Sequence, residues 1–192
     1  MSRSLQSLLK SLSSTSSVQI EGNSDTDGII FITDDSRKAN SGCIFSATAI
    51  GENFIQDAKN RGAKVFLISD EMELSGDFSD CVLIRTDQLE KVQGSLASEL
   101  NGNPSQSLYL VGVTGTNGKT SVTHMLYHIW KNEGIRAGMI GTLGVKYQSA
   151  EDQEISFSTG YTTPRAGELQ AILKTMMDSG VTDRKSGFTL VR

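Results

Sequence analysis

Several features that mark other classes of protein are scarce in this chain of 192 residues. Cys43 and Cys81 are its two cysteines, and both lie in apolar segments, which predicts buried thiols in a reducing compartment rather than a disulfide. No apolar run reaches the roughly 18 residues of a membrane-spanning helix, so membrane insertion is not expected. Lysine and arginine number 18 against 22 aspartates and glutamates, a net charge of −4. Because nucleic-acid-binding proteins usually carry a basic excess, this balance argues against that class.

The first 20 residues contain Arg3, Lys10 and many serines but no acidic residue, a composition weakly typical of an organelle transit peptide. The four leucines of this segment fall on one helical stripe: Leu5, Leu8, Leu9 and Leu12. This stripe predicts a helix packed against the first domain, and we expect a cytoplasmic protein.

Hydrophobic residues make up 37% of the chain and charged residues 21%, as in an ordinary globular protein. Short apolar runs alternate with amphipathic segments, which is typical of an α/β fold. In the first part of the chain the expected strands are residues 28–33, 43–45, 65–68 and 81–84, and the expected helices are residues 53–60 and 87–100.

Proline is also rare, and one of the two prolines, Pro104, lies in the polar segment 101–107. Such a helix-breaking segment is typical of a boundary between domains. We therefore predict a first domain at residues 1–103, a linker at 104–107 and a second domain at 108–192.

The second domain begins with a glycine-rich loop between a strand and a helix. Residues 108–113 are apolar and predict a buried parallel strand. Gly112, Gly115 and Gly118 recur at every third position of the segment that leads to Lys119 and Thr120. A loop in this setting directs backbone N–H groups and the positive end of a helix at phosphate. The pattern predicts binding of ATP by Gly115–Thr120, with Lys119 reaching the β- and γ-phosphates and Thr120 holding Mg²⁺.

After the loop, apolar residues recur at helical spacing and predict a helix: Val122, Met125, Leu126, Ile129 and Trp130. A further strand is expected at 136–140, a hairpin between 145–147 and 155–157, and a helix at 166–179. His124 and His128 are four residues apart, a spacing found in zinc sites. Met125 stands where a zinc protease motif has glutamate, so an ordinary helix face is predicted instead.

The loop Thr114–Thr120 resembles the ATP-binding loop of the Mur ligase family, which joins amino acids to peptidoglycan precursors. Further segments are similar to this family in the same order: Asp35-Ser36-Arg37 with Ile44-Phe45, then Met139–Gly144, then Thr162-Thr163-Pro164 leading into Glu168-Leu169-Gln170. The last of these favours the MurE branch. The resemblance extends from about residue 5 to about residue 181.

The resemblance implies a small uridine-nucleotide-binding α/β domain, followed by the start of a phosphate-loop domain with a mainly parallel sheet. It implies an ATP-dependent ligase, using Mg²⁺, that adds diaminopimelate or lysine to UDP-MurNAc-L-Ala-D-Glu through an acyl phosphate. Lys119 would be catalytic, Gly115, Thr116, Asn117, Gly118, Lys119 and Thr120 would bind ATP, and Thr120 would bind the metal ion. Ser36, Thr162 and Thr163 would contact the UDP-sugar substrate.

The resemblance fades after Val181. The Glu-Val-Ser-Ser-His segment of the family, its carbamylated lysine and its C-terminal domain have no counterpart in residues 182–192. The loop before Phe54 also departs from the family pattern. We therefore expect a truncated and inactive form of the ligase, with poor solubility.

Three alternatives remain open at this point. A MurF-type ligase shares the Asp-Ser-Arg and ATP-loop motifs. A non-catalytic protein that binds nucleotide or UDP-sugar would carry the same loop without forming an amide. An unrelated phosphate-loop NTPase would hydrolyse ATP without regard to a muramoyl substrate.

Overall fold

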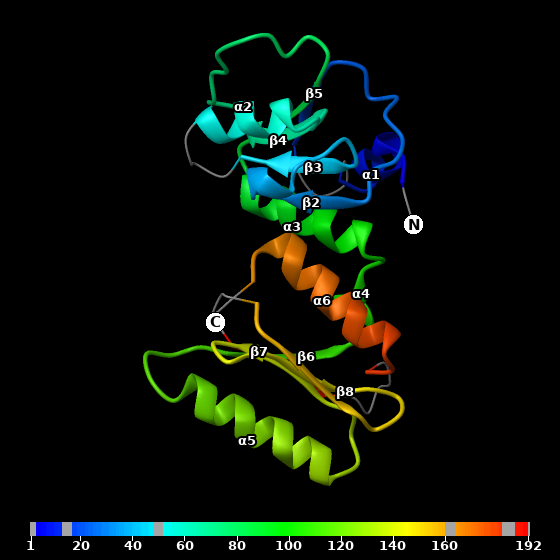
Figure 1. Ribbon diagram of the computed structural model, residues 1–192, viewed down its shortest axis with the longest axis vertical. Helices are drawn as coiled ribbons and strands as arrows, with labels where there is room; N and C mark the ends of the chain where they lie inside the picture. Colours follow the sequence, from blue (N-terminus) through cyan, green and yellow to red (C-terminus); the bar gives the residue numbers. More distant parts are fainter. Residues whose placement is uncertain (1–2, 13–16, 48–51, 160–163, 182–186, 192) are drawn as a thin grey trace. The chain divides into compact units, whose positions relative to one another are not determined.

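The computed structural model describes residues 3–12, 17–47, 52–159, 164–181 and 187–191. The chain divides into two compact units, Met1–Asn101 and Gly102–Arg192 (Figure 1). Pro104 is in the first turn of a short helix, α4 (Pro104–Ser107), in the segment predicted as a linker. The assignment of residues 1–103 to uridine-nucleotide binding stays a prediction.

The first unit is built on a five-stranded sheet in the order β1-β5-β4-β3-β2. Strands β2 to β5 are parallel, and β1 pairs antiparallel with β5. The strands are β1 (Gln19–Glu21), β2 (Phe31–Thr33), β3 (Cys43–Ser46), β4 (Val65–Ser69) and β5 (Val82–Thr86). Four of them lie in the predicted apolar runs, which supports an α/β fold.

Helices cover both faces of this sheet (Figure 1). Helix α2 (Glu52–Asn60) lies on one face, and α1 (Leu5–Leu12) and α3 (Leu89–Leu100) lie on the other. The predicted N-terminal leucine stripe is confirmed, because all four leucines of α1 are buried. On α3, which lies in the segment predicted as a helix, Val92, Leu96 and Leu100 are buried.

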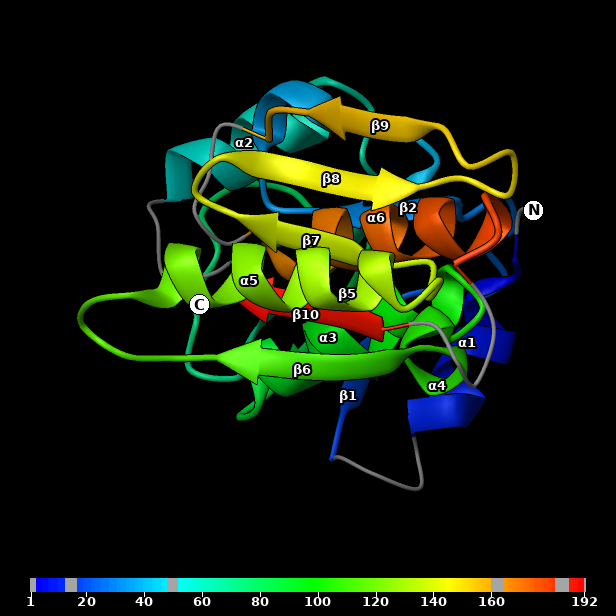
Figure 2. The same ribbon diagram turned by 90° about the horizontal axis from the view of Figure 1, so that it is seen from below.

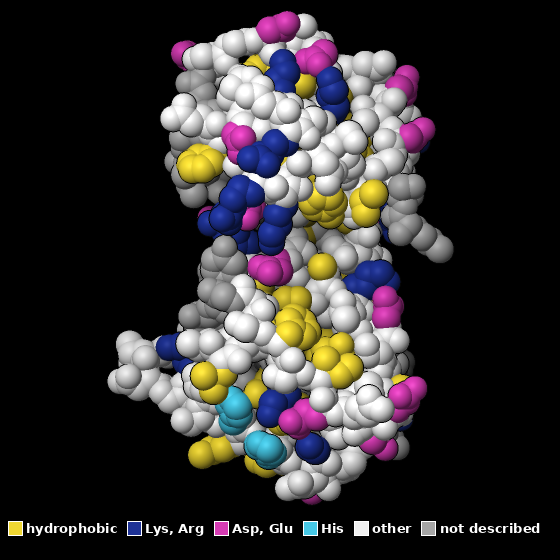
Figure 3. Space-filling model, in the orientation of Figure 1, with side chains coloured by type: hydrophobic (Ala, Val, Ile, Leu, Met, Phe, Trp, Pro, Cys, Tyr) yellow, Lys and Arg dark blue, Asp and Glu magenta, His cyan; other side chains and the backbone are white. Residues whose placement is uncertain are grey.

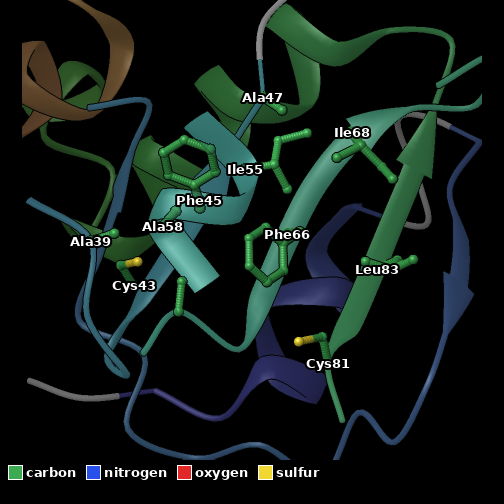
Figure 4. Close-up of a cluster of buried hydrophobic side chains, with 11 residues drawn as sticks. Ala39, Cys43, Phe45, Ala47, Ile55, Ala58, Phe66, Ile68, Cys81 and Leu83 are labelled. Carbon is green, nitrogen blue, oxygen red and sulfur yellow. The ribbon is translucent and has the colours of Figure 1, made fainter. Parts of the chain in front are cut away.

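The core under α2 contains Phe45 and Phe66, together with Ile55 from the helix (Figure 4). The two phenyl rings pack edge to face, with 6.1 Å between their centroids. Cys43 and Cys81 lie in the same cluster as free, buried thiols, as predicted. Burial raises the pKa of the Cys43 thiol, which is the expected effect of an apolar setting on a charged thiolate.

The second unit has a five-stranded sheet in the order β6-β10-β7-β8-β9. Strand β10 pairs parallel with both β6 and β7, whereas β7, β8 and β9 form an antiparallel meander. The strands are β6 (Tyr109–Val113), β7 (Gly138–Gly141), β8 (Gly144–Gln148), β9 (Glu154–Phe157) and β10 (Gly187–Val191). Helix α5 (Lys119–Asn132) covers one face and α6 (Ala166–Asp178) the other (Figure 2).

The core beneath α6 combines Ile172, Leu173 and Met176 with Ile140 and Tyr147 of the sheet. The helix predicted at 166–179 is confirmed, and these three of its residues are buried. Within the described part of the chain, no helix combines the length and hydrophobicity of a membrane span.

One burial prediction in this unit is wrong. Strand β6 is exposed rather than buried, with Tyr109 64% and Leu110 39% exposed, because it lies at the edge of the described sheet. On α5, Val122, Met125 and Ile129 are 44%, 63% and 55% exposed. The apolar surface of α5 is wider than one sheet face can cover, and the sheet takes the neighbouring side, where Thr123 and Tyr127 are buried.

Strand β10 was not predicted. It lies between β6 and β7, in the segment where the family resemblance had faded. Its backbone pairs along five residues of β6, so a central position of the parallel sheet is filled by residues 187–191.

Candidate phosphate-binding site

The loop from β6 to α5 has the backbone geometry of a phosphate cradle. Gly115 has a φ of 147° and Gly118 a φ of 78°, and such positive φ values favour glycine. Gly118 is the residue that caps α5, so that the helix begins at Lys119. Residues 114–118 are all exposed. The first N–H groups of the helix have no partner within it and can bind an anion in front of the loop.

The side chain of Lys119 is folded back over this loop. Its Nζ atom donates hydrogen bonds to the carbonyl oxygens of Gly115 and Thr116, the second at 3.4 Å. The ammonium group therefore lies above the loop, where it can exchange carbonyl oxygens for phosphate oxygens. Thr120 follows in the first turn of α5 and is half-buried.

A shallow depression that is open to solvent lies beside Thr120, and its enclosed volume of about 10 Å³ is that of about one water molecule. One wall consists of three residues of α5, and the other of strand β7 and the turn into β8. The lining residues are Thr120, Thr123, His124, Met139, Ile140, Gly141, Thr142, Leu143 and Gly144. We call this depression the Thr120 pocket. It lies at the carboxyl end of β7, the edge of a parallel sheet at which α/β proteins bind ligands.

A hydrogen bond and a glycine turn fix the walls of the Thr120 pocket. The Thr123 hydroxyl donates to the carbonyl oxygen of Lys119 at 2.8 Å. Gly144 has a φ of 100°, and a Cβ atom there would lie 2.4 Å from the carbonyl oxygen of Phe157, so the turn requires glycine.

The two histidines of the chain lie on the surface of the second unit, near lysine and acidic side chains (Figure 3). His124 lines the Thr120 pocket, whereas His128 does not. Burial and the nearby charges of Lys146 and His128 lower the pKa of His124. Among the described residues, no three or more His, Cys, Asp or Glu side chains are close enough to hold a metal ion.

The sequence interpretation did not identify His124 as a neighbour of the phosphate loop, although the residue lines the Thr120 pocket. The signal was its position four residues after Thr120, which places both side chains on one face of α5. The prediction of an ordinary helix face weighed His124 only as a zinc ligand with His128 and did not consider its position relative to Thr120.

In the first unit, Asp35 caps a short helical turn (Ser36–Lys38). Its carboxylate accepts from the backbone N–H of Arg37 at 3.1 Å and from the Arg37 guanidinium at 2.8 and 2.9 Å. These bonds to Arg37 lower the pKa of Asp35 to about 2. The Ser36 hydroxyl is buried and hydrogen-bonds the carboxylate of Asp57 in α2. The turn is thus fixed by its own side chains.

The predicted site residues fall in three places. Gly115–Thr120 come together in the loop of the second unit, and Ser36 belongs to the first unit. Thr162 and Thr163 lie outside the described residues.

A strand whose partner is parallel, a glycine-rich loop and a helix that begins at Lys119 define an α/β protein of the phosphate-loop class. The profile of the Mur ligase middle domain matches residues 113–183. The chain belongs to the Mur ligase family, and its relatives are of the MurE type.

One relative is the UDP-N-acetylmuramoyl-L-alanyl-D-glutamate--2,6-diaminopimelate ligase of Leptospira borgpetersenii serovar Hardjo-bovis. It is 44% identical over 161 residues, which cover 83% of this chain and 31% of the relative. The ligase of the same name from Leptospira interrogans serogroup Icterohaemorrhagiae is 40% identical over 171 residues, covering 83% of this chain and 32% of the relative. The chain thus spans about a third of the length of the curated relatives it matches.

Solved structures agree on the fold. A UDP-N-acetylmuramoyl-L-alanyl-D-glutamate--2,6-diaminopimelate ligase superposes with a TM-score of 0.68 at 22% identity, covering 100% of this chain and 36% of that one. A MurF structure from Acinetobacter baumannii gives a TM-score of 0.54 at 18% identity. The match covers 100% of this chain and 35% of the MurF chain.

Proposed function

We propose that this chain carries the ATP-binding loop and the uridine-nucleotide-binding unit of an ATP-dependent amide ligase of peptidoglycan precursor synthesis. The observation that carries the proposal is the loop itself, in which two glycines with positive φ precede a helix that begins with Lys119 and Thr120. The names of the relatives support the substrate UDP-N-acetylmuramoyl-L-alanyl-D-glutamate and favour 2,6-diaminopimelate over lysine as the added amino acid.

The residues of the loop fit a nucleoside triphosphate with its metal ion. Exposed backbone N–H groups at the start of α5 would surround the phosphates, and the Lys119 ammonium would neutralise charge on the β- and γ-oxygens. The Thr120 hydroxyl, in the first helical turn, would be a ligand of Mg²⁺. When bound, Mg²⁺ supplies charge neutralisation at the phosphates.

In the proposed reaction, a substrate carboxylate oxygen attacks the γ-phosphorus of ATP, and ADP leaves. The amine of the incoming amino acid then attacks the acyl carbon, and inorganic phosphate leaves as the amide forms. This chain's contribution would be to orient the triphosphate and to stabilise the negative charge on the transferred group.

Residues 1–103 are proposed as the uridine-nucleotide-binding domain and residues 108–192 as part of the ATP-binding domain. Ser36, Thr162 and Thr163 are proposed as contacts to the UDP-sugar. The support for Ser36 is its position just after β2, near the carboxyl end of the parallel strands, where ligands of such sheets bind. Because its hydroxyl already bonds Asp57, its contact with substrate would arise from a shared hydrogen bond or from its backbone.

The proposed ATP site is tested by calorimetric titration of MgATP into the chain and into Lys119→Ala. We expect saturable binding by the unaltered chain and a loss of at least about tenfold in affinity for the variant, because a charge-assisted contact to phosphate is removed. Lys174→Ala is the matched control, since Lys174 lies in the same unit in an exposed pair with Asp178. Equal affinities for the chain and Lys119→Ala would refute the site.

A further inference from the structure

The Thr120 pocket contains a polar residue for which the proposed reaction has no role. His124 lies one helical turn after Thr120 and lines the same wall. Side chains four residues apart on a helix are neighbours on its surface. A ligand atom held at Thr120 therefore lies next to the imidazole of His124.

Few other side chains of the Thr120 pocket can form a hydrogen bond to a bound ligand. The Thr123 hydroxyl already donates to the backbone carbonyl of Lys119. His124 and Thr142 remain as side chains that can hydrogen-bond a ligand near Thr120. Met139 and Ile140 supply a buried apolar lining, whereas Leu143 is 71% exposed.

We propose that the terminal phosphate of a bound nucleoside triphosphate lies at the open mouth of the Thr120 pocket, and that His124 hydrogen-bonds this phosphate and so makes the site prefer triphosphate over diphosphate. This inference rests on the proposed function, because it requires that the loop binds ATP. His124 is a specificity-determining residue in this account, distinct from Lys119 and Thr120.

Burial, and after it the charges of Lys146 and His128, lower the pKa of His124, which favours the neutral imidazole. Lys146 is itself paired with Glu154 at 3.1 Å, so its positive charge is largely balanced. A neutral imidazole still donates one N–H, so His124 can bond a phosphate oxygen without itself being charged.

The test compares the affinities of the 192-residue chain for MgATP and MgADP, measured by calorimetry, with those of His124→Leu. We expect His124→Leu to lose about fivefold or more in affinity for MgATP, the effect of one hydrogen bond, while its affinity for MgADP stays within about twofold. His124→Gln, which keeps a hydrogen-bond donor, should recover most of the preference. His128→Leu is the matched control, because His128 is exposed on the next turn and lies outside the pocket.

The outcomes separate this inference from the proposed function. If Lys119→Ala abolishes binding but His124→Leu leaves the ratio of the two affinities unchanged, the ATP site stands and the role of His124 is refuted. An equal loss for both nucleotides would show that His124 acts only on the structure of the loop, and this also refutes the inference. If the unaltered chain binds neither nucleotide, both proposals fail.

Discussion

Glu154 shows how single residues hold the phosphate-loop helix in place. Its carboxylate accepts from the buried Tyr127 hydroxyl and from Lys131 of α5, both at 3.0 Å, and pairs with Lys146 of β8 at 3.1 Å. These hydrogen bonds, Lys131 first and then Lys146, lower the pKa of Glu154 to about 2. One carboxylate therefore links strand β9 to helix α5 and to strand β8.

At the scale of this residue, we predict that Glu154→Gln lowers the free energy of unfolding at neutral pH by about 1 kcal/mol after solvent screening. The folded-state pKa is lowered from 4.5, so the stabilisation is present above that value and is lost as the pH falls toward 2. Urea unfolding of both proteins should show a difference that shrinks over this range. Glu151→Gln, an exposed carboxylate in the preceding turn, is the control. A difference that does not change with pH would contradict the account.

For helix α5, the sequence predicts that a helix is present but not which of its sides packs against the sheet. The apolar period after the loop predicts a helix in this segment, and the structure has it at Lys119–Asn132. The period did not determine which of two adjacent apolar sides meets the sheet, because that choice depends on residues distant in sequence. The packed side has Thr123 and Tyr127 at its centre, and Tyr127 pairs with Glu154 from the hairpin.

The two sides of α5 should respond differently to substitution. Met125→Gln on the exposed side is expected to change the free energy of unfolding by less than about 0.5 kcal/mol and to reduce self-association. Tyr127→Ala on the buried side should cost about 3 kcal/mol or more, since it leaves a cavity and removes the bond to Glu154. Chemical denaturation and light scattering measure these effects. A large loss of stability from Met125→Gln would show that the helix packs through the other side.

For the whole molecule, most of the order of strands, loop and helices was predictable because each motif is local in sequence, although β1 and α4 were not predicted. The loop residues 114–120 and the alternating elements of both units are examples. Strand β10 was not predictable, since it carries no motif and its position depends on pairing with β6 and β7, more than 40 residues earlier in the chain. The Thr120 pocket was not predictable for the same reason. Its second wall comes from the β7–β8 turn, which is distant in sequence from the loop.

The central claim is that one chain combines an ATP site with a site for a UDP-muramoyl peptide. Its most direct test is a calorimetric titration of UDP-N-acetylmuramoyl-L-alanyl-D-glutamate into the chain saturated with MgATP. The account predicts saturable binding of one molecule per chain, undiminished by the nucleotide. No binding, or displacement by ATP, would contradict it and would favour a phosphate-loop protein that is indifferent to muramoyl substrates.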